Sequence, residues 1–524
     1  MIASIPSAVL VGVDGTQVAV EVHVSNGLPG FTVVGLPDTA VRESRDRVRA
    51  ALLSSGLSWP LRRVTVNLAP SGMKKGGAGL DLPIAVGVLV ASGVIDPGRV
   101  EGLAFVGELG LDGSLRGVPG TVALADALRR FRLVVPTESA KESRLAGDVD
   151  LLTSTTLAGV VAGLAHQEQW RTASRSSGCG GAGPDAPATG ISTGAFGTLE
   201  DPHTPDLADV RGQRVARRAL EVAAAGGHHL LLVGPPGSGK SMLAARLPGL
   251  LPVLSRPTAL EVTRIHSVAG LRLPPTGLIE RPPYRAPHHG VSPVAMIGGG
   301  TSGMRPGEIS LAHGGVLFLD EMGEFPVPVL DALRQPLEEG QVRVSRARGT
   351  ATFPARFILV GAMNPCPCGE GGPPGRCRCS PVSRERYARR LSGPLLDRFD
   401  IAVRVERPES DELLGPAGGE SSSVVAARVA RARRRAAERG VGVNAQLPAP
   451  ALADLAPMSR AAVAVVERSL RSGALSGRGL HRVQRLARTV ADLEGAGAVL
   501  EEAHVRQALV LRPPRELLSR GEGQ

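Results

Sequence analysis

Aromatic residues, dispersed cysteines and long apolar runs are all scarce in this chain of 524 residues. Aromatic side chains make up only 2% of it, so a platform that stacks the bases of single-stranded nucleic acid is not expected. The longest apolar candidate, residues 82–95, is too short to cross a bilayer and contains Gly and Ser. The first residues lack the positive segment of a signal peptide. We therefore expect a cytoplasmic protein that does not contact a membrane.

Cysteine usage argues against a secreted fold held by disulfides. Four of the five cysteines lie within residues 366–379, whereas secreted disulfide scaffolds spread paired cysteines through a short chain. The fifth, Cys179, lies in a stretch rich in Gly and Ser, and we expect it to be a free thiol.

Acidic residues are outnumbered by basic ones, which gives a formal net charge of +11. An excess of this size suits a polyanionic partner such as DNA or RNA. The alternative is an Arg-rich composition spread over ordinary solvated faces. With so few aromatic residues, contacts to nucleic acid would be mainly Arg to phosphate, and they would weaken steeply with salt.

Changes in composition divide the chain into five parts. Residues 1–165 alternate short β-like and helical patterns, which predicts an α+β domain. Residues 166–206 are rich in Gly, Ser and Pro and are expected to form a flexible linker. Residues 207–407 repeat a strand, loop and helix pattern typical of a parallel α/β sheet, and residues 408–515 are mainly helical. Residues 516–524 form a tail.

The strongest motif is the stretch GPPGSGKS, which follows an apolar strand at residues 229–233 and precedes a helical pattern. It satisfies the phosphate-binding pattern G-x-x-x-x-G-K-[ST], in which backbone N–H groups and a helix N-terminus face the phosphates. Lys240 is expected to reach the β- and γ-phosphates, and Ser241 to ligate Mg²⁺. We therefore predict ATP and Mg²⁺ at this loop. The predicted nucleotide-binding residues are Gly234, Pro235, Pro236, Gly237, Ser238, Gly239, Lys240 and Ser241.

Two further apolar strands end in polar residues. The strand at residues 316–319 is followed by Asp320 and Glu321, and the next strand ends in Asn364. A phosphate site of this kind needs a carboxylate to hold Mg²⁺ and another group to orient the attacking water. We predict that Asp320 is the metal ligand, Glu321 the general base and Asn364 a sensor of the γ-phosphate. The alternative for Asn364 is a turn-capping amide.

The clustered cysteines form two close pairs, Cys366-x-Cys368 and Cys377-x-Cys379, joined by a Gly/Pro-rich loop. Two such pairs can converge as four thiolates, which suits tetrahedral Zn²⁺. Four protein ligands leave no open position, so the predicted zinc is structural. A reduced cluster without metal and a pair of disulfides remain the alternatives.

The order of these motifs, followed by LSGPLLDRFDI and SGRGLHRVQRLARTVADLEG, resembles the YifB/ComM family of magnesium-chelatase-like AAA+ ATPases. The similarity extends over nearly the whole chain. It implies a multidomain α/β protein with a P-loop AAA+ core, a parallel sheet and a helical lid. It also implies an N-terminal domain with the ribosomal-S5/Lon-protease-like fold, and assembly into a ring that is expected to be a hexamer.

The resemblance also implies roles for individual residues. Arg398 matches the arginine finger that reaches the γ-phosphate bound to a neighbouring subunit, with a surface arginine as the alternative. Arg478 matches the sensor 2 arginine of the lid, and Arg482 is the second choice. Val210 and Gly212 match the segment that borders adenine.

Proteolysis of the Lon type is not expected. It needs a Ser nucleophile and a Lys base, but the corresponding segment carries Gly, Leu and Asp81, and Thr121 stands near the place of the lysine. Ser71, Lys74 and Lys75 are present in an order and spacing that do not match. We interpret this domain as a scaffold or a partner-binding module.

Several basic segments are candidates for contact with DNA. The stretch GQVRVSRARGTATFPARF predicts a β-hairpin with four arginines on or near its turn, and the alternative is a solvated tip. These arginines are Arg343, Arg346, Arg348 and Arg356. Residues 427–440 are basic on all sides, and a DNA contact and a solvated helix are equal alternatives for them. His288 and His289 are interpreted as loop or interface histidines in preference to metal ligands.

Together these features predict an ATP-hydrolysing ring motor on DNA. The resemblance implies a helicase or branch-migration activity in recombination or natural transformation. The alternative is a chaperone that, like a magnesium-chelatase subunit, remodels a protein partner.

Overall fold

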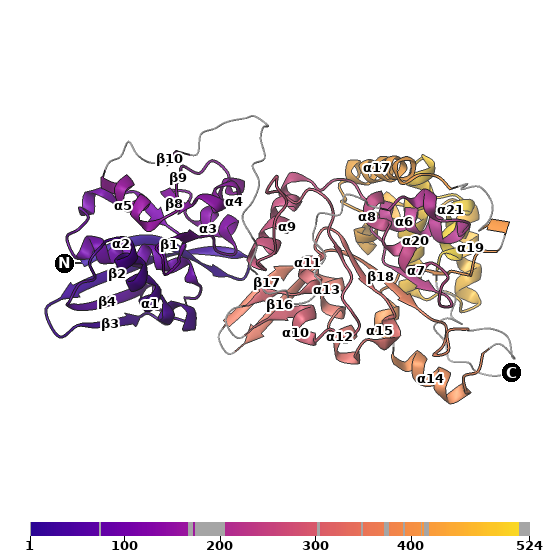
Figure 1. Cartoon of the computed structure of the whole chain (residues 1–524). Helices are drawn as coiled ribbons and strands as arrows, with labels where there is room; N and C mark the ends of the chain where they lie inside the picture. Colours follow the sequence, from indigo (N-terminus) through magenta and orange to yellow (C-terminus); the bar gives the residue numbers. More distant parts are fainter. Residues whose placement is uncertain are drawn as a thin grey trace.

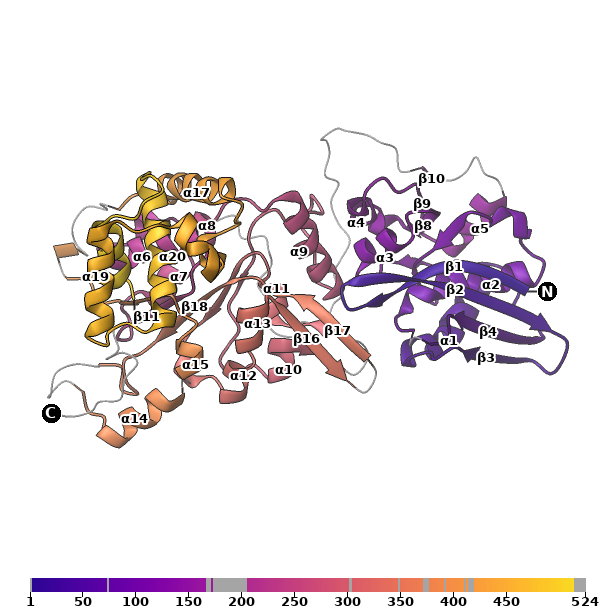
Figure 2. The ribbon, with the colours of Figure 1, turned by 180° about the vertical axis from the view of Figure 1, so that it is seen from behind.

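The computed structural model places most of the chain. It describes residues 2–72, 75–165, 171–172, 205–300, 304–346, 349–370, 377–390, 393–409, 411–412 and 419–512. The predicted linker lies almost wholly outside these residues, as do the tail, Cys179, Lys74 and Arg348. Within the described ranges, no helix is long and apolar enough to cross a membrane. The N-terminal region lies at one end of the molecule and the C-terminal helices at the other (Figures 1 and 2).

The N-terminal region begins with a four-stranded sheet in the order β1-β2-β4-β3. Its strands alternate buried and exposed side chains because one face packs on helices. Helix α2 is buried on every side because every residue after Asp81 is apolar, and it lies against β1 and β2. These elements are β1 (Ile2–Val11), β2 (Asp14–Ser25), β3 (Gly30–Val34), α1 (Thr39–Ser54), β4 (Arg63–Ala69) and α2 (Asp81–Ala91).

A second, smaller sheet completes this region in the order β10-β9-β8-β5. Strands and helices are therefore both present here, as the alternating patterns predicted. The elements are β5 (Leu103–Phe105), β6 (Glu108–Leu109), β7 (Leu115–Arg116), α3 (Thr121–Ala127), β8 (Arg132–Pro136), α4 (Ala140–Ser143), β9 (Leu151–Ser154), α5 (Leu157–Ala165) and β10 (Arg171–Thr172).

The central sheet has the order β12-β15-β18-β11-β19, and every neighbouring pair is parallel. The predicted parallel α/β sheet is confirmed. Its strands read as short apolar runs because both faces are covered. They are β11 (Leu230–Val233), β12 (Tyr284–Arg285), β15 (Val316–Leu319), β18 (Ile358–Met363) and β19 (Ile401–Arg404). Since parallel strands end at one edge, the residues that follow β11, β15 and β18 are brought together there.

Short helices and two hairpins surround this sheet. They are α6 (Arg214–Gly226), α7 (Lys240–Ala244), α8 (Leu247–Leu250), α9 (Arg256–Val268), α10 (Pro293–Ile297), β13 (Gly298–Gly299), β14 (Arg305–Pro306), α11 (Glu308–Leu311), α12 (Val327–Asp331), α13 (Arg334–Glu339), β16 (Gln341–Arg346), β17 (Gly349–Pro354), α14 (Pro381–Arg390) and α15 (Gly393–Leu396). The C-terminal region is helical, as expected. Its helices are α17 (Ser422–Glu438), α18 (Leu452–Leu455), α19 (Arg460–Arg471), α20 (Gly477–Glu494) and α21 (Glu502–Val510).

Helix α17 corrects one interpretation of the sequence. It is not basic on all sides, because a stripe of small apolar residues is buried against α6 and α20. Arg433 donates to the carbonyl oxygen of Ala224 at 2.9 Å, and Arg428 pairs with Glu221 and Glu420. Long arginine side chains can cover apolar surface in this way while their charge is paired. The buried stripe consists of Val425, Val429, Ala432 and Ala436.

The N-terminal region contacts the central region through α3 and α9. The Gly120 N–H donates to the Ser267 carbonyl oxygen at 3.1 Å, and Arg264 pairs with Asp126 at 2.6 Å. Val13, in the β1–β2 turn, packs against the apolar cluster beneath the β16–β17 hairpin. The two regions therefore meet at α9 and at this hairpin.

Candidate ATP site

The phosphate-binding loop connects β11 to α7, as the sequence predicted. Gly237 and Gly239 have φ angles of 75° and 92°, in the left-handed region that favours glycine. At Gly234 a Cβ atom would lie 2.0 Å from the carbonyl oxygen of Val405, so only glycine fits beside β19. The glycines of the motif are thus required by backbone conformation and by close packing.

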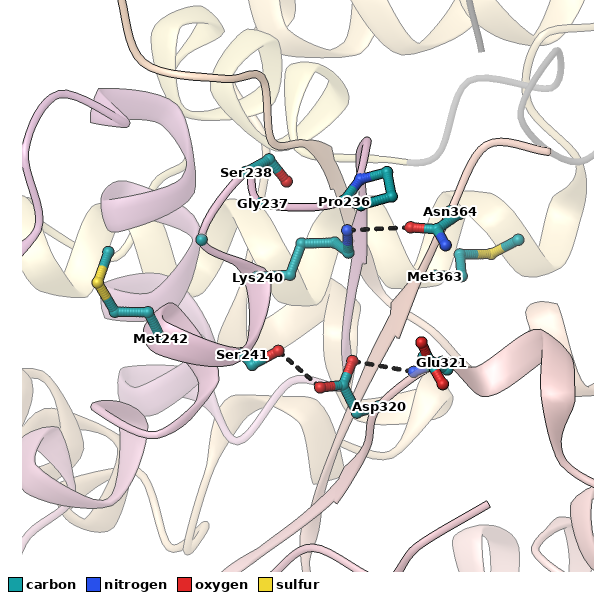
Figure 3. Close-up of a pocket in the computed structure, with 11 residues that line it drawn as sticks. Pro236, Gly237, Ser238, Lys240, Ser241, Met242, Asp320, Glu321, Met363 and Asn364 are labelled. Atoms are coloured by element: carbon teal, nitrogen blue, oxygen red, sulfur yellow. Dashed lines mark hydrogen bonds between the residues drawn. The ribbon is translucent and has the colours of Figure 1, made fainter. Parts of the chain in front are cut away.

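Lys240 points into the site from the first residue of α7 (Figure 3). Its ammonium donates to the carbonyl oxygens of Gly234 and Pro235, both at 2.8 Å, and to Asn364 Oδ1 at 3.2 Å. Burial lowers the pKa of Lys240, while the nearby carboxylates of Asp320 and Glu321 raise it. The ammonium is therefore held where three oxygen atoms converge.

Ser241 and Asp320 lie side by side at the edge of the sheet. Ser241 Oγ donates to Asp320 Oδ2 at 2.6 Å, so both oxygens face the same point (Figure 3). A hydroxyl and a carboxylate in this arrangement suit Mg²⁺, which uses few protein ligands beside phosphate and water. Ser238 Oγ is buried in the loop and makes no hydrogen bond within the described residues, which suits a phosphate oxygen as its partner.

Glu321 adopts an unusual backbone conformation, with φ at 49°. Positive φ is uncommon for a residue other than glycine, and it often marks functional positions. The Glu321 N–H donates to Asp320 Oδ1 at 2.9 Å. Its own carboxylate is exposed, and His289 Nδ1 lies 3.4 Å from its Oε2. The sequence analysis noted the histidine pair but missed this contact.

A cavity of about 400 Å³ joins these groups. The structure thus brings together Lys240, Ser241, Asp320, Glu321 and Asn364, which the sequence had placed on three separate strands. The cavity is lined by residues 236–242 together with Asp320, Glu321, Met363 and Asn364.

The two residues expected near adenine occupy different environments. Gly212 lines a second cavity of about 470 Å³, whereas Val210 is fully buried in the core and can only support that segment. Gln213 ties the segment to the phosphate loop, since its amide nitrogen donates to the Ser238 carbonyl oxygen at 3.3 Å.

Arg398 and Arg478 do not line the cavity of their own chain. Arg398 is paired with Glu338 of α13. Burial lowers the pKa of Arg398, and the charges of Arg482, Arg478 and Arg334 lower it further, which places these guanidinium groups near one another. The structure therefore gathers a cationic cluster, formed by Arg334, Arg398, Arg478 and Arg482, away from the phosphate loop.

A buried network that the sequence analysis missed holds this cluster in place. His228 Nδ1 lies 3.3 Å from Asp400 Oδ2, and its Nε2 lies 2.8 Å from Thr489 Oγ1 on α20. Arg482 Nε lies 3.9 Å from Asp400 Oδ1. Burial alone would raise the pKa of Asp400, but the bond to His228 and the neighbouring positive groups lower it overall. The turn that carries Arg398 is thus tied to the C-terminal helices.

Comparison with known proteins agrees with this geometry. The family model described as "Magnesium chelatase, subunit ChlI" matches residues 206–413. Two related models match on either side, "Subunit ChlI of Mg-chelatase" at residues 20–139 and "Magnesium chelatase, subunit ChlI C-terminal" at residues 419–512.

Individual relatives cover the chain almost from end to end. The protein YifB of Salmonella typhimurium is 42% identical over 522 residues, which are 99% of this chain and 98% of YifB. The competence protein ComM of Haemophilus influenzae is 41% identical over 522 residues, with 99% of both chains covered. The chain belongs to the YifB/ComM family of magnesium-chelatase-like AAA+ proteins. A more distant match, the probable DNA helicase MCM9 of Arabidopsis thaliana, is 26% identical over 195 residues, 36% of this chain and 24% of that protein.

Membership of the YifB/ComM family indicates that the cavity is a site of ATP hydrolysis. Proteins with this magnesium-chelatase-like AAA+ core bind ATP with Mg²⁺ and hydrolyse it. The residues that the structure gathers at the sheet edge have the chemistry for that reaction, namely a lysine, a hydroxyl, two carboxylates and an amide.

The four cysteines of this family member converge. All four Sγ atoms lie within 4.8 Å of one another, and Cys366 Sγ lies 3.3 Å from Cys368 Sγ and 3.6 Å from Cys377 Sγ. Four thiolates around Zn²⁺, with Zn–S bonds of about 2.3 Å, stand about 3.8 Å apart. Backbone N–H groups lower the pKa of Cys368 to about 6, which favours the thiolate. The arrangement fits the predicted set of Cys366, Cys368, Cys377 and Cys379.

The predicted β-hairpin is present as β16 and β17, paired from Gln341↔Pro354 to Arg346↔Gly349. Its inner face buries Val342, Val344 and Phe353, and Arg343 lies on the exposed face. Arg356 is not near the turn, contrary to expectation. It follows the end of β17, where its N–H donates to His313 Nδ1 at 3.0 Å.

The N-terminal residues weighed for proteolysis differ in their surroundings. Ser71 is exposed, whereas Lys75 is buried and donates to the carbonyl oxygen of Pro70. Asp81 is buried and bonded to Arg47 and Ser44. In the described part of the chain, no lysine ammonium is hydrogen-bonded to a serine hydroxyl.

Proposed function

We propose that this YifB/ComM-family protein is an ATP-driven ring motor that acts on DNA, of the helicase or branch-migration type used in recombination or natural transformation. The observation that carries the proposal is the β16–β17 hairpin. Its apolar face is anchored in the core next to β15 and β18, while Arg343 and three hydroxyl side chains lie on the exposed face. The net charge of +11 also supports a DNA partner, as do two relatives named as a competence protein, ComM, and a probable DNA helicase, MCM9.

The chemical step is assigned to the residues at the sheet edge. Lys240 holds the β- and γ-phosphates, while Ser241 and Asp320 hold Mg²⁺. Glu321 accepts the proton of the attacking water, and Asn364, bonded to Lys240, senses the γ-phosphate. Mg²⁺ supplies neutralisation of the charge that develops on the phosphate oxygens.

Ring assembly follows from the position of the arginines. Because Arg398 and Arg478 lie outside the cavity of their own chain, they act on the nucleotide of a neighbouring subunit. A head-to-tail interface that repeats in this way closes into a ring, which we propose to be a hexamer. A finger supplied in trans is worth about 10³–10⁵ in rate.

The remaining parts support the motor. We propose that residues 1–165 form a scaffold with the ribosomal-S5/Lon-protease-like fold, that residues 166–206 link it to the core at 207–407, and that residues 408–515 form the lid. The four cysteines hold a structural Zn²⁺ that fixes the chain between Asn364 and Arg398. Loss of this clip weakens hydrolysis by displacing both groups.

The test is ATPase stimulation by DNA. Turnover of the assembled protein is measured with single-stranded, duplex and forked DNA over a series of salt concentrations. We expect stimulation that falls steeply with salt because phosphate contacts dominate. Arg343→Ala is expected to reduce the stimulation, with Arg471→Ala, an exposed arginine of α19 outside the hairpin, as the matched control. If none of these DNAs stimulates turnover at low salt, the DNA motor is excluded.

A second function has its own support, namely that three magnesium-chelatase models match this chain. In that case the ATPase remodels a protein partner. The same assay separates the two, because a remodelling chaperone is stimulated by its partner protein and not by DNA.

A further inference from the structure

The His288–His289 pair has no part in the ATPase mechanism above, yet His289 lies against its general base. The His289 Nδ1 atom is 3.4 Å from Glu321 Oε2. Among the described residues, no other basic side chain lies within 4 Å of this carboxylate. Glu321 is 58% exposed, so packing does little to fix its rotamer. His289 is therefore the basic neighbour placed to orient it.

The loop that carries His289 is itself fixed where it begins. It leaves β12, which pairs with β15 in the register Tyr284↔Val316, and β15 leads directly to Glu321. Arg285 makes two bonds of 2.7 Å to the carboxylate of Glu308 in α11. The loop therefore has a defined position relative to the catalytic edge.

A tight turn then sets the direction of the imidazole. The Gly290 N–H donates to His288 Nδ1 at 3.0 Å, and the Val291 N–H donates to the His288 carbonyl oxygen at 2.9 Å. The His289 ring is tilted against that of His288, with ring centroids 4.0 Å apart, and it meets the buried ring of Phe325 edge-on. The two histidines thus have different tasks: His288 closes the turn, and His289 faces Glu321.

We propose that His289 is the positioning residue for Glu321, and this rests on the proposed ATPase mechanism. With Nδ1 protonated, it attracts Oε2, 3.4 Å away, and leaves Oε1 free to accept the proton of the attacking water. The water oxygen then bonds to the γ-phosphorus, and the bond to the ADP oxygen breaks with its electron pair. His289 itself transfers no proton. The same loop leads into α10 and the β13–β14 hairpin, so movement of this insertion changes the orientation of the base.

The test uses three variants of the full-length protein. His289→Ala is expected to lower kcat about 10- to 100-fold, since misplacing a catalytic group by about 1 Å costs about 10². The KM for ATP and the affinity for mant-ATP should change less than about twofold, because ground-state binding does not use this contact. In His289→Asn the side-chain amide nitrogen stands near the place of Nδ1, so this variant should recover most of the rate. Val294→Ala, an exposed change in the same insertion, is the matched control and should keep basal turnover.

A double-mutant cycle sharpens the assignment. If His289 acts only through Glu321, His289→Ala should cost nothing further in a Glu321→Gln background. A kcat of His289→Ala within about twofold of the unmodified protein would overturn the proposal. So would equal losses in His289→Ala and His289→Asn with a lower Tm, because that pattern indicates a structural role. Absence of DNA stimulation with the His289 effect intact would reject the DNA motor alone.

Discussion

Replacing Arg398 by alanine is expected to remove turnover while leaving nucleotide binding intact. In its own chain Arg398 is bonded to Glu338 and is separate from the lined cavity. The two side chains are 25% and 55% exposed, so this ion pair contributes at most about 1 kcal/mol to folding. A finger acting in trans contributes about 10³–10⁵ in rate. The variant should therefore fold and bind ATP, yet hydrolyse it at least about 10³-fold more slowly.

Mixing experiments give this prediction a quantitative form. Each composite site needs Lys240 from one subunit and Arg398 from the next. In rings assembled from equal amounts of Lys240→Ala and Arg398→Ala chains, one interface in four combines the two intact halves, so about a quarter of the sites should recover. The assay is steady-state ATPase after the two proteins are refolded together.

The matched control combines Lys240→Ala with Glu321→Gln. Both changes disable the same half of the composite site, so no interface regains a complete set and no activity should return. Recovery in this control, or none in the Arg398 mixture, would refute the assignment in trans. Wild-type turnover by Arg398→Ala alone would show that the finger has been misplaced.

Two further predictions concern metal and pH. The double variant Cys366→Ser/Cys379→Ser should lose bound zinc, measured by elemental analysis, and should lose ATPase activity; normal turnover without metal would leave the cluster without a role. Burial lowers the pKa of His229 and of His266 to about 4, below the usual 6.5, so the unfolded chain binds more protons between these values. Stability should therefore be full above pH 6.5 and decrease by a few kcal/mol as the pH falls towards 4, which thermal unfolding over this range would show. A Tm that does not change over this range would contradict the buried, neutral state of both histidines.

The core of the ATP site could be predicted from local sequence. The phosphate loop is one continuous motif, and Asp320 and Asn364 each follow an apolar strand. Parallel strands that share an edge then bring them together without any further information. For this reason Lys240, Ser241 and both carboxylates were placed correctly relative to one another.

The features that the sequence could not supply depend on contacts between distant segments. The clustering of Arg398 with Arg478 requires the packing of α15 and α20, which no local pattern encodes. The contact of His289 with Glu321 depends on the pairing of β12 with β15, and β12 has only two residues. The buried face of helix α17 was not predicted for another reason. Small apolar residues and the stems of arginines form this face and conceal the amphipathic pattern of the helix.

The β1–β2 turn lies against the β16–β17 hairpin. Gly12 lies so close to β17 that a Cβ atom there would stand 3.3 Å from Ala351 Cβ, and Val13 packs into the cluster beneath the hairpin. The hairpin cannot swing towards the N-terminal region without displacing it. The position of the hairpin therefore depends on the N-terminal region as well as on the core beneath it.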